Sequence, residues 1–97
     1  MSVRAYRIKR IEHEDFPSFN IWHHKKLVEY LERNSNFFST LNEDSVGIAE
    51  VEVEILVKAL EDPEVISSTP EYVLDQIRED IKEAWRKNED YILYYCF

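Results

Sequence analysis

The sequence predicts a small α+β domain in which helices cover a three-stranded sheet. Two amphipathic helical patterns and an aromatic, strand-like segment at residues 90–97 indicate this fold class. A length of 97 residues, a hydrophobic fraction of 44% and a single Gly favour one globular domain over residues 1–97. The expected strands cover residues 3–11, 46–53 and 90–97, and the expected helices cover residues 20–34, 54–61 and 70–87.

The helix expected over residues 70–87 has the clearest signals. A hydroxyl side chain precedes Pro70, and Glu71 adds negative charge at the positive end of the helix dipole. The apolar residues of this segment follow a helical period and form one stripe: Leu74, Ile77, Ile81, Ala84 and Trp85. Asn88 can end the helix in a left-handed conformation. We therefore expect one face of this helix to lie on the core.

Residues 90–97 are too short for a stable isolated helix and are rich in aromatic side chains, which favours a strand. Alternation places two sets on opposite faces: Tyr91, Leu93, Tyr95 and Phe97 on one, and Ile92, Tyr94 and Cys96 on the other. Both sets are apolar or amphipathic. We therefore expect the strand to be covered on both faces, or to lie centrally in the sheet.

Residues 3–11 are expected to form a neighbouring strand. Tyr6 and Ile8 share one side of the alternation, while Arg7 and Lys9 share the other. Four basic residues in this segment would either bind an anion or keep a sheet edge in solvent, and we favour the second interpretation.

The helix over residues 20–34 would follow a cap at Ser18 or Asn20 and would end near Asn34. Residues 45–61 are ambiguous, because their apolar positions fit both a half-buried strand and a helix. Gly47 and the β-branched residues after it favour a strand to about residue 53, followed by a helix. The alternative is a single helix over residues 45–61 with a two-stranded sheet.

Charge restricts the classes of partner. The net charge is −8, with +2 over residues 1–33 and −10 over residues 34–97. This balance disfavours direct binding to nucleic acid or to an anionic membrane surface. No run of about 18 apolar residues predicts a membrane span. With a single Cys and no signal-peptide pattern, the expectation is a soluble, cytoplasmic protein.

A few side chains of metal-ligand type lie near one another in the sequence: Glu12, His13, Glu14, His23 and His24. Their spacing matches no established metal motif. Adjacent His23 and His24 would diverge by about 100° on a helix, and His24 falls on the apolar stripe. No phosphate loop or nucleophile elbow occurs, and burial would make Cys96 unreactive. We therefore expect neither a cofactor nor catalysis.

The leading functional hypothesis is a non-enzymatic module that binds another protein or itself, including a homodimer through a sheet edge. Trp22 and Tyr94 are the interface candidates, because Trp22 lies off the best apolar stripe of its helix and Tyr94 lies on the weaker face of its strand. One alternative is an acidic inhibitor that imitates nucleic acid through a single patch: Glu50, Glu52, Glu54, Glu79 and Glu83. The other is a small metal-dependent enzyme that uses the region around His13, His23 and His24.

Overall fold

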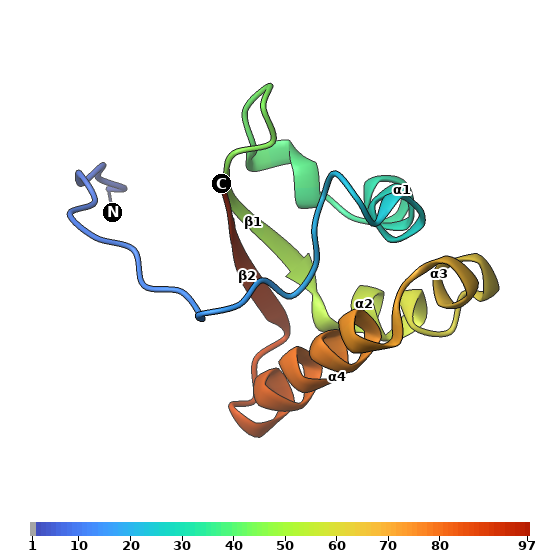
Figure 1. Ribbon diagram of the computed structural model, residues 1–97. Coiled ribbons are helices and arrows are strands. Elements are labelled where there is room, and N and C mark those ends of the chain that lie inside the picture. The colour runs from blue at the N-terminus through green and yellow to red at the C-terminus, as the bar shows by residue number, and fades with distance from the viewer. Residues whose placement is uncertain (1) are drawn as a thin grey trace.

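The computed structural model describes residues 2–97 (Figure 1). In chain order the elements are α1 (Lys25–Asn34), the 3-10 helix η1 (Phe37–Thr40), β1 (Gly47–Glu52), α2 (Val53–Ala59), α3 (Pro63–Ser68), α4 (Glu71–Arg86) and β2 (Tyr91–Cys96). Four α-helices and a two-stranded antiparallel sheet make this an α+β fold, which confirms the predicted class.

The sheet consists of β1 and β2, with Ala49 opposite Tyr94 and Glu50 opposite Leu93. Within residues 2–97 no third strand pairs with them, so the expected three-stranded sheet is wrong. The sheet has two strands, as in the alternative, but the single helix over residues 45–61 that the alternative also contained does not form. Residues 45–61 divide into β1 and then α2. The observed division, a strand from Gly47 followed by a helix from Val53, agrees with the boundary predicted near residue 53.

Residues 3–11 do not form the predicted strand. They run without regular structure, and each residue from 2 to 10 is exposed. An alternating pattern makes a strand only when its backbone pairs with a neighbour and one of its faces is buried. The apolar side chains of this segment meet neither condition here. Figure 1 shows the N-terminal part of the segment standing away from the helices and from the sheet.

α1 begins at Lys25, five residues later than expected, because Asn20 organises a turn before it. The side-chain oxygen of Asn20 accepts hydrogen bonds from the backbone N–H groups of Trp22 and His23, at 2.8 and 3.2 Å. The backbone N–H of Asn20 in turn donates to Nδ1 of His24, at 2.8 Å. These local bonds compete with helix formation, as polar side chains near a helix start often do.

The last helix agrees with its prediction. α4 spans Glu71–Arg86, and Asn88 follows it at φ 56°, the left-handed conformation expected at this end. The connection before it contains one helix that the sequence interpretation missed, α3. The side chain of Asp62 caps α3 by accepting from the N–H groups of Glu64 and Val65.

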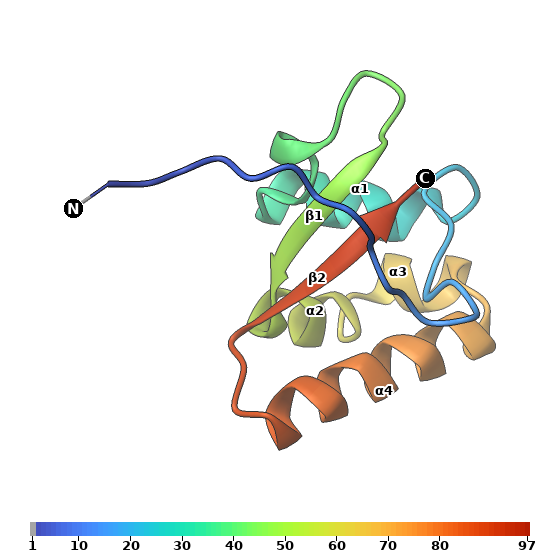
Figure 2. The ribbon, with the colours of Figure 1, turned by 90° about the vertical axis from the view of Figure 1, so that its left-hand side faces the viewer.

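The hydrophobic core lies between the helices and one face of the sheet. Figures 1 and 2 show α1, α2, α3 and α4 gathered on that side, while the N-terminal end of the chain lies on the other. The fully buried large side chains of the core are Leu27, Leu31, Phe37, Val51, Leu56, Val65, Val73, Leu74 and Ile77. Among residues 2–97, no helix has both the length and the apolar character needed to cross a bilayer.

Candidate protein-binding face

The two faces of the sheet have different surroundings. On the face toward the helices, Ala49 and Val51 are buried, and Ile92, Tyr94 and Cys96 are half-buried against the core. We call this the covered face. Burial raises the pKa of the Cys96 thiol, which keeps it protonated and poorly nucleophilic near neutral pH.

No helix lies over the opposite side, which we call the open face. Its members are Ile48, Glu50 and Glu52 from β1, Tyr91, Leu93 and Tyr95 from β2, and Phe97 beyond it. Leu93 is 65% exposed, and the ring centroids of Tyr95 and Phe97 lie 4.7 Å apart. The expectation that residues 90–97 are covered on both faces is therefore wrong. The strand that would have flanked them is absent, and all the helices pack on one side.

A single ring from outside the sheet reaches the open face. The imidazole of His13 lies with its centroid 5.1 Å from that of Phe97 and 6.0 Å from that of Tyr95. Nδ1 of His13 lies 2.8 Å from the carbonyl oxygen of Glu14, which fits an N–H donor on that nitrogen. This contact touches one end of the face, and Leu93, farther along β2, stays exposed.

A polar cluster around Asp80 holds the covered face in place. One carboxylate oxygen of Asp80 accepts hydrogen bonds from the hydroxyls of Tyr94 and Ser18, at 2.8 and 2.6 Å, and the other accepts from the amide of Gln76 at 3.0 Å. Desolvation of the Tyr94 hydroxyl raises its pKa well above the usual value, and the negative charge of Asp80 raises it further. The cluster joins β2, α4 and the segment before α1. Each polar group in it has a structural partner.

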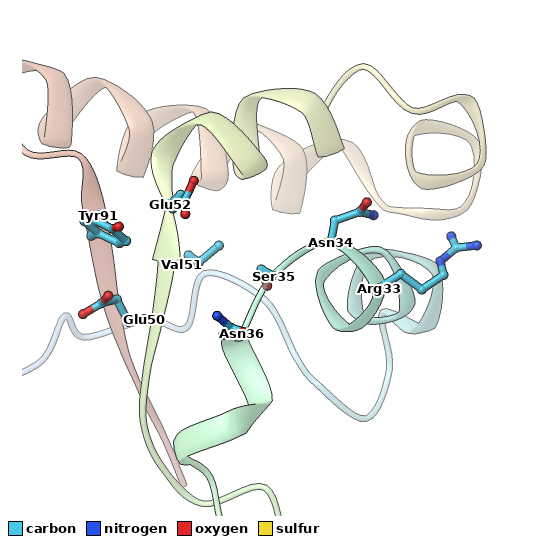
Figure 3. Close-up of a pocket in the computed structure, with 8 residues that line it drawn as sticks. All are labelled: Arg33, Asn34, Ser35, Asn36, Glu50, Val51, Glu52 and Tyr91. Atoms are coloured by element: carbon cyan, nitrogen blue, oxygen red, sulfur yellow. The ribbon is translucent and has the colours of Figure 1, made fainter.

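The cavity beside β1 is lined by polar residues. It has a volume of about 380 Å³ and lies between the end of α1 and the two strands. Figure 3 shows the side chains of Glu50 and Tyr91 on the strands, with the guanidinium of Arg33 directed away from them. The hydroxyl of Ser35 donates to the carbonyl of Leu31 at 2.6 Å, so it ends the helix rather than facing a base. This arrangement holds no activated nucleophile.

A second hollow adjoins the open face at the start of β2. It has a volume of about 510 Å³, and four carboxylate residues and two aromatic rings dominate its lining: Glu52, Glu54, Glu89, Asp90, Trp85 and Tyr91. We call it the acidic cleft. Trp85 is 59% exposed although the sequence places it on the core stripe of α4. Carboxylates beside exposed rings favour Lys or Arg side chains, through charge and through cation–π attraction.

The structure does not bring the predicted metal candidates together. Glu12 pairs with Arg10, and Nδ1 of His24 accepts the Asn20 N–H. Burial lowers the pKa of His24, and the neighbouring charge of His23 lowers it further. Throughout residues 2–97 no three His, Cys, Asp or Glu side chains are grouped closely enough to hold a metal ion.

The acidic residues named for nucleic-acid mimicry have different environments. On α4, Glu79 is paired with Lys82, and Glu83 is paired with Arg86 and Lys87. Glu54 of α2 is paired with Lys58 at 3.3 Å. Over the described part of the chain, Glu50 and Glu52 make no ion pair, and both lie on the open face. Of these five carboxylates, the two without an ion pair thus lie beside the exposed rings of the sheet.

The two interface candidates from the sequence occupy contrasting positions. Trp22 is 75% exposed in the turn before α1, whereas Tyr94 lies on the covered face with its hydroxyl bound to Asp80. Their role in an interface stays a prediction. The sequence interpretation missed Leu93, Tyr95 and Phe97 as surface residues. The available signal was the alternation of Glu50 and Glu52 with apolar residues, because it marks which side of β1 faces solvent.

Comparisons of this chain with protein-family models, with curated proteins and with solved structures find no match.

Proposed function

We propose that this chain is a non-enzymatic protein-binding module and that the open face of its sheet is the binding surface. The observation that supports this proposal is the row of exposed apolar side chains on β2, which ends in the neighbouring, mutually tilted rings of Tyr95 and Phe97. Water contact with such a row is unfavourable, and contiguous exposed apolar side chains on a small domain mark interaction sites. Aromatic residues are also the commonest energetic anchors of interfaces.

The covered face also supports this proposal, because its contacts hold the sheet in a fixed position. The Asp80 cluster and the buried residues beneath Tyr94 hold the sheet on the helices. The open face is therefore presented on a supported scaffold, which reduces the entropy lost on association.

Site-specific photo-crosslinking tests this function. A benzophenone amino acid replaces Leu93 on the open face in one variant and Tyr72, an exposed residue of α4, in the control. After irradiation in a cell extract, we expect the Leu93 position to give a discrete protein adduct and the Tyr72 position to give none. Equal labelling at the two positions, or no adduct at either, would refute the proposal.

A further inference from the structure

Residues 2–12, which we call the arm, have the composition of a ligand for the open face. Arg4, Arg7, Lys9 and Arg10 give the arm four positive charges against the single negative charge of Glu12. Its larger apolar side chains, Val3, Tyr6 and Ile8, are between 62% and 100% exposed. An extended segment with these properties has apolar surface to bury and cations without a full set of partners.

The open face and the acidic cleft offer the complementary groups. Glu50 and Glu52 lie on the face without ion pairs among the described residues, and the cleft beside Tyr91 adds further carboxylates. Leu93, opposite Glu50, and Tyr95, opposite Ile48, provide apolar surface beside these carboxylates. The arm and the face thus both combine apolar side chains with charges, and the charges are of opposite sign.

In this structure the arm lies away from its own acidic cleft. His13, just after the arm, is held against Tyr95 and Phe97, at the end of β2 opposite to the cleft. The six residues of β2 span about 20 Å between these ends. Figure 1 shows the arm standing away from the sheet, and in Figure 2, where it crosses in front of the strands, it does not run to the start of β2.

From these observations we propose that the arm of a second copy of this chain lies across the open face, with its basic side chains at Glu50, Glu52 and the acidic cleft. The inference rests on the proposed function and names its partner. Every chain offers one arm and one face, so a two-fold exchange satisfies both surfaces of both copies. The result is a homodimer held by apolar contacts and opposite charges.

The test uses sedimentation equilibrium of full-length variants at low salt. The arm variant carries Arg4→Gln, Arg7→Gln, Lys9→Gln and Arg10→Gln. Its control instead neutralises three cations on helices and one directly after α4: Lys25→Gln, Arg33→Gln, Lys82→Gln and Lys87→Gln. The net charge of both therefore changes equally. We expect the wild type and the control to dimerise, and the dimer Kd of the arm variant to rise at least about tenfold.

A second pair of variants probes the face. Leu93→Lys should abolish the dimer, whereas Tyr72→Lys, at an exposed position on α4, should leave it intact. Mixing the arm variant with the Leu93→Lys variant should restore dimers, because one intact arm then meets one intact face. Two faces that pack directly on each other would give no such rescue, and that result would overturn the inference.

A wild type that is monomeric at 200 µM (about 2 mg/ml) would also overturn the inference, whether its arm is free or bound to its own face. The proposed function would then be judged separately by the Leu93 crosslink. An adduct with a different protein would preserve the function and exclude the second copy as partner. Absence of any adduct would remove both.

Discussion

The covered and open faces belong to the same two strands, yet they perform different tasks. Adjacent residues of β2 illustrate the difference: Tyr94 is fixed by Asp80 beneath the sheet, while Leu93 and Tyr95 project into solvent. The covered face therefore contributes to folding, and the open face contributes little to it. An apolar residue that does not stabilise the fold is available for binding, and the following predictions test that division.

The largest contrast in stability is expected between two phenylalanines. Phe37 is fully buried and its ring centroid lies 6.2 Å from that of Tyr94, whereas Phe97 is 78% exposed. Phe37→Ala should lower the free energy of unfolding by about 3–5 kcal/mol through lost burial and a cavity. Phe97→Ala should change it by less than about 0.5 kcal/mol when measured by urea unfolding at concentrations where the chain is monomeric. Similar losses of stability in both variants would contradict the division between a covered face that stabilises the fold and an open face that does not.

The next largest difference in stability is expected between variants of two neighbouring tyrosines, Tyr94 and Tyr95. Tyr94→Phe removes a 2.8 Å hydrogen bond to the Asp80 carboxylate and should lower the free energy of unfolding by about 1–2 kcal/mol. The loss is no larger because Ser18 and Gln76 still donate hydrogen bonds to that carboxylate. Tyr95→Phe on the open face should be nearly neutral. Thermal and urea unfolding of the two variants give the comparison, and a neutral Tyr94→Phe would show that the Asp80 cluster does not stabilise the sheet.

Alkaline pH should weaken the contribution of Tyr94 to stability. The pKa of Tyr94 is raised in the folded state, so its contribution is complete below the unfolded value of about 10 and is lost as the pH rises through the folded pKa. Between these values the unfolded chain releases a proton that the folded chain keeps. Wild-type stability should fall above pH 10 by up to about 1.4 kcal/mol per pH unit more steeply than that of Tyr94→Phe. Equal slopes in the wild type and in Tyr94→Phe would contradict this contribution of Tyr94.

The smallest effect on stability is expected at Glu50. Glu50→Gln removes a charge that has no ion pair among residues 2–97. The free energy of unfolding should therefore change by less than about 0.5 kcal/mol. Dimerisation at low salt should nevertheless weaken about two- to fivefold, and 0.5 M NaCl should remove the difference from wild type. Glu79→Gln, which alters a carboxylate paired with Lys82 on α4, is the matched control and should leave the dimer unchanged.

The sequence predicted the elements that carry their own local signals. The stripe from Leu74 to Ala84 and the ending at Asn88 located α4, and the change from β-branched residues to Leu and Ala located the boundary between β1 and α2. The failure at residues 3–11 has a different origin. Tyr6 and Ile8 alternate as strand residues do, but strand formation depends on a partner that no local pattern specifies.

The candidate site was largely beyond the sequence for the same reason. Residues 90–97 are apolar on both sides, and only the placement of the helices decides which side is left open. With Tyr94 and Leu93 equally plausible as surface residues, alternation alone could not assign them. The acidic cleft likewise joins Trp85 of α4 to Glu52 of β1, which lie far apart in the sequence.

The most direct test of the account is an isotope-filtered NMR experiment on a mixture of labelled and unlabelled wild-type chains. It detects contacts between two copies separately from contacts within one copy. If the arm of one copy binds the open face of another, we expect intermolecular contacts from Tyr6 and Ile8 of the arm to Leu93 and Tyr95. These contacts should be absent in the arm variant and in Leu93→Lys. Arm contacts to the face that occur only within one chain, or an open face without any intermolecular contact, would contradict it.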